Sequence, residues 1–295
     1  MSVLEELSTA AVSVVQAVGP SVVRVGRHGG RGCGVVIADG YIATNAHNLR
    51  GEEVTVTFAD GRQAVATVAG VDVDGDVVVV SVDTAGVPPV RWADGPAQAG
   101  QIVFAVTRTA LGGDRVSFGL VSGTERAFRG PRGRRIKGSI EHTAPLPRGS
   151  SGSPVVTADG TVIGLNTNRL GEGFYLALPA DAELRARLDS LAAGQSRTRR
   201  RLGLGLAPAH VARALRRSVG LPERDGLLVR AVEEGSPAAA AGVQEGDLIV
   251  GAAGAPIGSA DDLFDALDRA ETELALQLVR GADELEVVVR FDTSE

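Results

Sequence analysis

The segment Arg148-Gly-Ser-Ser-Gly-Ser-Pro154 holds Ser151 in a short turn, with a glycine two residues before it and another directly after it. A serine hydroxyl is a weak nucleophile at neutral pH. It needs a base within hydrogen-bond reach and donors for the oxyanion that its attack creates. Because Gly149 has no Cβ, the backbone amides of Gly149 and Ser151 can point into one small space. Such turns are common, so a catalytic interpretation depends on partners elsewhere in the chain.

Two upstream residues are candidate partners for Ser151. His47 follows the predicted strand 41–44, where an imidazole can face a cleft, although a lone histidine of this kind is more often an ordinary surface residue. Asp76 begins the apolar run 77–80, and a carboxylate at the mouth of a buried strand needs a hydrogen-bond donor such as an imidazole N–H. The three residues form a candidate nucleophile, base and acid.

The apolar pattern between residues 21 and 178 predicts a mainly β domain. Turns such as Asp39-Gly40 and Asp60-Gly61 separate short β runs, and no alternation of strands with helices appears. In this context the order histidine, aspartate, serine is that of the chymotrypsin-like double β-barrel, whereas α/β-hydrolases and subtilisins have other orders. The predicted strands are 21–25, 34–38, 41–44, 54–58, 64–71, 77–82, 102–106, 116–121, 155–156, 162–166 and 174–178.

Helical and polar segments flank these strands. An apolar stripe from Val3 to Val18 predicts a helix that ends at Gly19-Pro20 and packs against another element, and 181–191 predicts a helix that closes the domain. The basic stretch 123–137 has low apolar content and predicts a polar loop.

Composition limits the class of protein. The chain has 295 residues, 44% of them hydrophobic, and a formal net charge of −6, which predicts two globular domains and argues against nucleic acid as the main ligand. No apolar run is long enough to span a membrane, and a single cysteine, Cys33, excludes an internal disulfide. As written, the sequence predicts a cytoplasmic protein. A sequence shortened at an export segment would instead belong in the periplasm or another extracytoplasmic compartment.

We predict no metal and no cofactor. Asp72, Asp74 and Asp76 superficially resemble a calcium loop, but the glycine and the distal glutamate of that pattern are missing at the required offsets.

The sequence resembles the HtrA/Deg-type serine proteases, in which a chymotrypsin-like protease domain precedes one or more PDZ domains. The matching segments are 21–25, 32–47, 76–80, 118–122, 149–154 and 162–167. The resemblance implies that His47 is the general base, that Asp76 orients it and that Ser151 is the nucleophile. It further implies an oxyanion hole at the amides of Gly149 and Ser151, and a primary specificity pocket lined by Gly164, Leu165, Asn166 and Thr167.

The sequence departs from the family pattern near the proposed nucleophile. Ser150 and Ser153 stand where the family usually has Asn and Gly, Arg148 replaces a Pro, and Cys33 replaces a Ser. A Cβ at residue 153 could tilt the turn after Ser151, which leaves the rate open. His142-Thr143 replaces a Thr-Asp pair, and His142 either touches the cleft or is an ordinary exposed or hydrogen-bonded histidine.

The C-terminal part of the sequence resembles a PDZ domain in its bacterial permuted form, chiefly through the segment 235–249. We predict a protease domain at 1–193, a basic linker at 194–201 and a PDZ domain, a small α+β fold, at 202–295. PDZ domains bind C-terminal peptides by adding a strand to a sheet edge, with backbone amides that capture the carboxylate. The expected carboxylate loop is Arg201, Leu202, Gly203 and Leu204, and the expected groove residues are Leu263 and Leu267.

The resemblance implies an ATP-independent serine endopeptidase of unfolded or misfolded polypeptides, regulated through peptide binding by its PDZ domain. The alternative is a weakly active or inactive peptide-binding, chaperone-like scaffold. A homo-oligomer is expected, and the family often forms trimers, but the chain has no aromatic residue before Tyr41 for contacts of that kind.

Cleavage is expected after Val, Ala, Ile or Leu, because the segment 165–167 carries no acidic residue for a basic side chain. A shallow pocket with little preference is the alternative. Cleavage after Lys or Arg would instead imply that Glu172 folds into the pocket.

Overall fold

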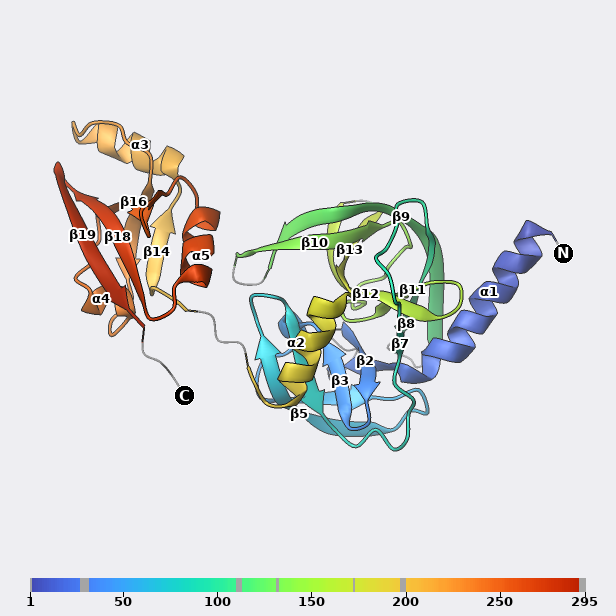
Figure 1. Cartoon of the computed structure of the whole chain (residues 1–295). Helices are drawn as coiled ribbons and strands as arrows, with labels where there is room; N and C mark the ends of the chain where they lie inside the picture. The colour runs from blue at the N-terminus through green and yellow to red at the C-terminus, as the bar shows by residue number, and fades with distance from the viewer. Residues whose placement is uncertain are drawn as a thin grey trace. The chain divides into compact units, whose positions relative to one another are not determined.

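The computed structural model describes residues 2–26, 32–109, 113–130, 133–171, 173–196 and 200–291. The chain divides into two compact units, Met1–Arg197 and Thr198–Glu295 (Figure 1). The predicted domain limits stay predictions, and linker residues 197–199 lie outside the described ranges. None of the described helices has the length and apolar character that crossing a bilayer requires.

The first unit begins with a closed barrel in the order β1-β2-β3-β6-β5-β4. Its interior is almost wholly aliphatic, with Val36, Ile42 and Val80 fully buried around Phe58. The strands are β1 (Val22–Val25), β2 (Gly32–Ala38), β3 (Tyr41–Thr44), β4 (Glu53–Thr57), β5 (Gln63–Asp72) and β6 (Val77–Ser81).

A second set of strands forms another barrel in the same unit. Its sheet order is β11-β8-β9-β10-β13-β12-β7, and an additional pairing of β11 with β12 closes it. The predicted mainly β, chymotrypsin-like fold is therefore confirmed. The strands are β7 (Arg91–Trp92), β8 (Ile102–Arg108), β9 (Asp114–Arg129), β10 (Arg135–His142), β11 (Pro154–Val156), β12 (Thr161–Gly171) and β13 (Phe174–Pro179).

The loop prediction for 123–137 was wrong. β9 continues to Arg129 and pairs with β10, which begins at Arg135. Most side chains of this ribbon are exposed, so its strands carry few apolar residues, and backbone pairing plus the nearly buried Phe128 hold it instead. The ribbon extends from the second barrel in Figure 1.

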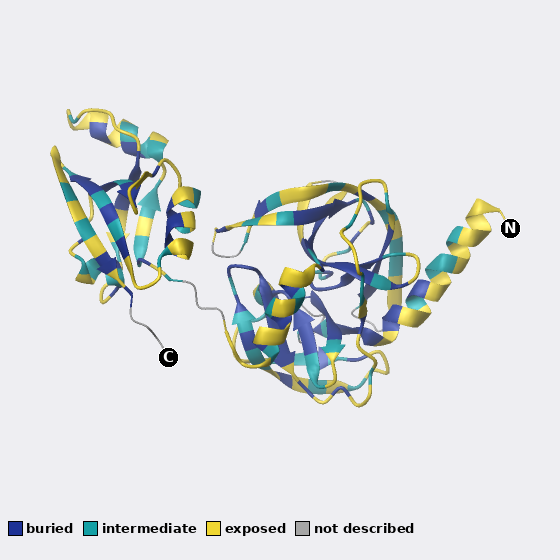
Figure 2. Cartoon of the chain, viewed as in Figure 1, coloured by how far each residue is buried: buried dark blue, intermediate teal, exposed yellow. Residues whose placement is uncertain are grey.

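Two helices pack on the first unit. In α1 (Val3–Val18), Val14 and Val18 are buried, Leu7 packs against the same core, and the N-terminal Val3 and Leu4 are exposed, so the predicted apolar stripe is covered except at its N-terminal end (Figure 2). The helix α2 (Ala182–Ala192) begins at the N-cap Asp181, whose carboxylate accepts from the amide of Leu184.

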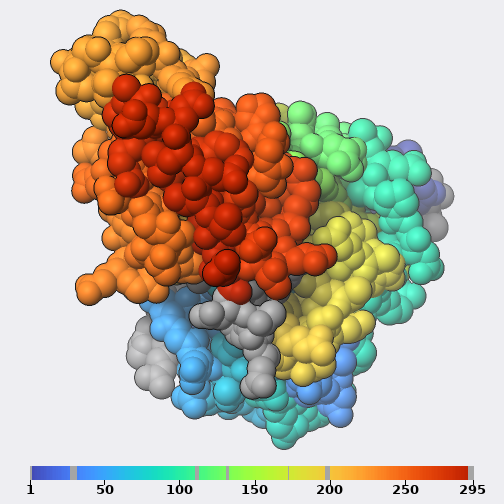
Figure 3. All heavy atoms as spheres, turned by 60° about the vertical axis from the view of Figure 1, so that its left-hand side comes forward, coloured from blue at the N-terminus to red at the C-terminus, as the bar shows by residue number. Residues whose placement is uncertain are grey.

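The second unit has a sheet in the order β14-β15-β16-β18-β19, with β17 paired to β16. In Figure 3 the hairpin of β18 and β19 (red) forms a continuous face of this unit. The elements are β14 (Leu204–Ala207), α3 (Ala209–Ser218), β15 (Leu227–Val232), α4 (Pro237–Ala240), β16 (Leu248–Ala252), β17 (Ala255–Pro256), α5 (Ala260–Arg269), β18 (Glu273–Arg280) and β19 (Asp283–Arg290).

Candidate active site

Asp76 is a buried charged residue of the first unit. It precedes β6, is 1% exposed and has a left-handed φ of 54°, a conformation that aspartate tolerates better than most residues. Its carboxylate oxygens both lie 2.9 Å from Nδ1 of His47. The hydroxyl of Thr167 donates to the same carboxylate at 2.6 Å, and the backbone N–H of His47 donates at 3.2 Å. The buried charge is therefore fully hydrogen-bonded.

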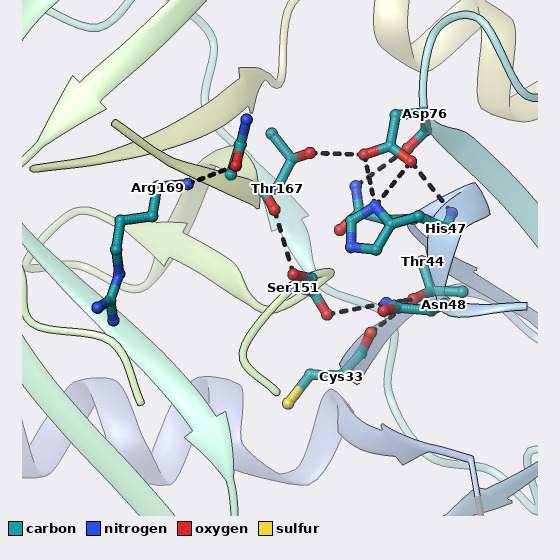
Figure 4. A network of polar contacts seen from close by, with 10 residues as sticks. Cys33, Thr44, His47, Asn48, Asp76, Ser151, Thr167 and Arg169 are labelled. Atoms are coloured by element: carbon teal, nitrogen blue, oxygen red, sulfur yellow. Dashed lines mark hydrogen bonds and ion pairs between the residues drawn. The ribbon is translucent and has the colours of Figure 1, made fainter. Parts of the chain in front are cut away.

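His47 contacts Asp76 on one side and is partly exposed to solvent on the other. It lies in the short 3₁₀ turn Ala46–Asn48 after β3, and its side chain is 37% exposed. A ring whose Nδ1 faces a carboxylate keeps the proton on Nδ1, which leaves Nε2 as a base directed away from Asp76. Figure 4 shows the ring between Asp76 and Ser151.

Ser151 is fixed by its backbone rather than by its side chain. Its carbonyl accepts from the amide of Cys33 at 2.7 Å and from Nδ2 of Asn48 at 3.1 Å. Its Oγ donates to the carbonyl of Thr167 at 3.1 Å. The next residue, Gly152, has φ 86°, and a Cβ there would lie 2.1 Å from the carbonyl oxygen of Cys33, so only glycine fits.

The amides of Gly149 and Ser151 remain available to a ligand. Gly149 has φ 82°, and its carbonyl accepts weakly from the thiol of Cys33 on the interior side, with the sulfur 3.5 Å away. Among the residues that the structure describes, neither amide donates to a protein acceptor. This is the arrangement that an oxyanion hole requires.

The residues that depart from the family pattern are hydrogen-bonded or buried around the turn. Ser153 is fully buried, and its hydroxyl accepts from Nδ2 of Asn166 at 3.0 Å. Ser150 donates to the carbonyl of Pro147 at 2.8 Å. Cys33 is fully buried, and burial raises the pKa of its thiol, so it is an unreactive core residue.

His142 lies beneath the site rather than in it. It is fully buried, its Nε2 is 2.7 Å from Oδ1 of Asn166, and its ring stacks on Tyr175 with centroids 5.7 Å apart. Its Nδ1 is buried without a hydrogen-bond partner in the described part of the chain. Burial lowers the pKa of His142, and the bond to Asn166 offsets only part of that effect.

A cavity of about 550 Å³ adjoins these residues, and we call it the Ser151 cavity. Asn166 and Thr167, two of the four predicted pocket residues, line it. Gly164 and Leu165 do not, because Leu165 packs in the hydrophobic core and Gly164 lies against Leu178 and Ala177 of β13. The part of β12 that lines the cavity therefore begins two residues later than predicted. The lining is His47, Asp76, Phe128, Arg129, Gly130, Leu146, Pro147, Arg148, Gly149, Ser150, Ser151, Asn166, Thr167, Asn168, Arg169 and Tyr175.

Several residues that line the Ser151 cavity were not predicted from the sequence. Asn168 and Arg169 continue the strand predicted to end at Asn166, and pairing of β12 with β13 extends it to Gly171. A signal was the predicted start of the next strand at Phe174, since a hairpin partner that begins there can pair with β12 up to Gly171. Glu172, the acidic alternative for this pocket, lies outside the described residues.

The aspartates that resemble a calcium loop have other partners. Arg187 lies 3.4 Å from Asp72, and Arg134 lies 3.6 Å from Asp74. Within the described ranges, no group of three or more His, Cys, Asp or Glu residues is arranged to hold a metal ion.

In the second unit, β14 is an edge strand, so its outer side can pair with an added strand. The carbonyls of Leu202 and Gly203 accept from the amides of Ala238 and Glu233, which fixes the predicted carboxylate loop. The loop also carries Arg201, which lies 3.7 Å from Glu233.

The predicted groove residues Leu263 and Leu267 are only 2% and 4% exposed, and they pack in the domain core. Partly buried Leu204, Leu206 and Phe264 border the same cluster. Leu204 was predicted in the carboxylate loop, and Leu206 and Phe264 were not predicted as site residues.

Comparison with known proteins gives matches over both units. Residues 32–165 match the trypsin-like peptidase domain family, and residues 228–280 match the PDZ domain family. The putative serine protease HhoA of Synechocystis is 33% identical over 284 residues, which cover 90% of this chain and 71% of HhoA. Mitochondrial serine protease HTRA2 of Drosophila pseudoobscura is 30% identical, and the match covers 88% of this chain and 65% of that protein. The chain thus spans about two thirds of the length of the fly relatives.

Among solved structures, the HtrA-type protease AlgW with a decapeptide is similar over 95% of this chain and 97% of its own, with a TM-score of 0.72 and 22% identity. At that identity the likeness shows the fold.

The buried, neutral His142 predicts a loss of stability in acid. Its pKa lies below the ordinary value of 6.5, so the unfolded chain takes up a proton first as the pH falls. Stability from this residue is therefore complete above pH ~6.5 and falls below it, by up to about 1.4 kcal/mol per pH unit.

Thermal unfolding at pH 7.5 and pH 5.5 tests this, in a Ser151→Ala background that prevents self-cleavage. The Ser151→Ala protein should lose more stability over this range than Ser151→Ala carrying His142→Gln, which keeps a donor near Asn166 but cannot titrate. Equal losses in the two proteins would contradict the assignment.

Proposed function

Because the chain belongs to the HtrA family of serine proteases, we propose that it is an ATP-independent serine endopeptidase of unfolded or misfolded polypeptides. The observation that carries this proposal is the joint placement of Asp76, His47 and Ser151 beside two unused backbone amides. Base, orienting acid, nucleophile and oxyanion donors thus border one cavity.

In the proposed reaction, the hydroxyl of Ser151 attacks a peptide carbonyl while Nε2 of His47 takes its proton. Asp76 stabilises the imidazolium that forms and keeps the ring in the productive tautomer. The amides of Gly149 and Ser151 donate to the developing oxyanion. His47 then protonates the leaving amine, and water hydrolyses the acyl-enzyme by the same steps in reverse.

The resting hydrogen bond of Ser151 gives substrate binding a further role. Its Oγ donates to the carbonyl of Thr167 rather than to His47. An extended substrate that pairs its own N–H with this carbonyl competes for the same acceptor, which frees Oγ to turn toward Nε2 of His47. Binding and activation of the nucleophile are then coupled.

Regulation by C-terminal peptides is proposed from the second unit. The edge strand β14, the bordering α5 and the fixed loop 201–204 match what strand addition with carboxylate capture needs. Residues Leu204, Leu206 and Phe264 are proposed to line the groove, with Leu263 and Leu267 beneath them. The solved AlgW relatives are complexes with peptides.

The same resting bond also favours a second candidate function, a weakly active or inactive peptide-binding scaffold of chaperone type. If Oγ stays on Thr167 when substrate binds, the turn holds polypeptide without cleaving it. Assembly into a homo-oligomer belongs to either proposal, and the exposed Val3 and Leu4 of α1 offer an apolar surface for it.

Substitution of the proposed nucleophile and acid separates these functions. Ser151→Ala should abolish cleavage of casein with little change in melting temperature, because Oγ makes one hydrogen bond. Asp76→Asn should lower turnover by as much as ~10⁴, since an amide can no longer select the productive tautomer of His47. Casein digestion followed by gel densitometry measures both. Losses below tenfold would contradict the roles assigned to Ser151 and Asp76, whereas a parent protein that does not cleave casein would support the scaffold.

Peptide capture by the second unit predicts an effect of the terminal carboxylate. In the full chain carrying Ser151→Ala, a peptide ending in hydrophobic residues should bind with micromolar affinity, and amidation of its C-terminus should weaken binding, because the loop amides lose a charged acceptor. Isothermal titration calorimetry compares the two peptides. Equal affinities would rule out the carboxylate loop at 201–204.

A further inference from the structure

The arginines of the Ser151 cavity have no part in the proposed reaction. Arg129, Arg148 and Arg169 line the cavity, and Asp76 is the only carboxylate among its described lining residues. The side chain of Asp76 is 2% exposed and already hydrogen-bonded. The cavity therefore carries excess positive charge at neutral pH, in contrast to the apolar pocket expected from the sequence.

Arg169 places its charge inside the cavity. Its Nη2 donates to the carbonyl of Leu146 at 2.9 Å, and its guanidinium carbon lies 5.0 Å from the ring centroid of Tyr175. Leu146 belongs to the segment before Ser151, whereas Arg169 belongs to β12, so the side chain reaches from one wall to the other. Figure 4 shows it on the side of Ser151 away from His47.

The guanidinium has donors left for a ligand. Arginine carries five N–H donors, and the contact with Leu146 uses one. No described carboxylate forms an ion pair with Arg169 or with the exposed Arg148 beside Gly149. Arg129 adds a third charge from the end of β9, where it also donates to the carbonyl of Gly133.

We propose that the Ser151 cavity selects substrates with a glutamate or aspartate on the N-terminal side of the cleaved bond, and that Arg169 binds this carboxylate. The inference rests on the proposed protease function. When a substrate carbonyl lies at Oγ of Ser151 and its N–H pairs with the carbonyl of Thr167, the side chain of that residue enters the space between the two walls. A carboxylate there meets a planar guanidinium that favours bidentate pairing.

Other side chains fit this cavity less well. An apolar side chain would shield the N–H donors of Arg169 from water without replacing their hydrogen bonds. A lysine would meet like charge from three arginines. A glutamine keeps the shape of glutamate but not its charge, so it is the matched comparison.

The test measures kcat/KM of the full chain on fluorogenic peptides that differ at this one position, with Glu, Gln, Leu or Lys. The Glu peptide should exceed the Gln peptide by at least about tenfold, equivalent to ~1.4 kcal/mol. Arg169→Gln should bring the ratio close to one. Arg115→Gln, an arginine of β9 outside the cavity, should leave the ratio unchanged.

Mapping of cleavage sites in casein by mass spectrometry provides a second measurement without any variant. Most sites should follow Glu or Asp. A ratio near one in the parent protein, an unchanged ratio in Arg169→Gln, or a majority of sites after Val, Leu, Lys or Arg would overturn the inference while leaving the protease proposal intact. Failure to cleave casein at all would contradict the protease proposal and the inference together.

Discussion

The Asp76 carboxylate is the interaction on which the site depends. It is buried between the two barrels, where an unpaired charge would cost several kcal/mol. Its donors come from both barrels: His47 follows β3 of the first, and Thr167 belongs to β12 of the second. Because both barrels donate hydrogen bonds to this one carboxylate, its burial fixes the position of one barrel relative to the other. The cavity lies where the loops of the two barrels meet.

The turn around Ser151 is fastened to the first barrel by a second set of contacts. The amide of Cys33 and the side chain of Asn48 both hold the carbonyl of Ser151, and Gly152 fits against the carbonyl of Cys33 only because it lacks a Cβ. On the other side, Asn166 binds Ser153 and His142. The hydroxyl of Ser151 thus sits on a rigid backbone, and a single hydrogen bond, to the carbonyl of Thr167, holds its side chain.

The parts that the sequence predicted are those set by local chemistry. Valine-rich runs, some of them ended by Asp-Gly turns, located most strands of both barrels, and the order of His47, Asp76 and Ser151 indicated the double-barrel fold. The β9–β10 ribbon was missed because its stability comes from backbone pairing in an exposed hairpin, which leaves little apolar pattern. The prediction placed the pocket wall too early in β12 and omitted Arg169. The reason is that the length of β12 depends on its pairing with β13 rather than on its own composition. Thr167 was expected in the pocket, but its bond to Asp76 is a contact between strands that no local pattern encodes.

Labelling with a fluorophosphonate probe tests most directly whether Asp76, through His47, activates Ser151. The probe reports the nucleophile and the oxyanion donors together, without any assumption about substrate. The account predicts that the folded protein is labelled at Ser151 alone, located by mass spectrometry, and that Asp76→Asn, with an unchanged circular dichroism spectrum, is labelled far more slowly. Absence of labelling in the folded parent protein, or equal labelling rates for the parent and Asp76→Asn, would contradict it.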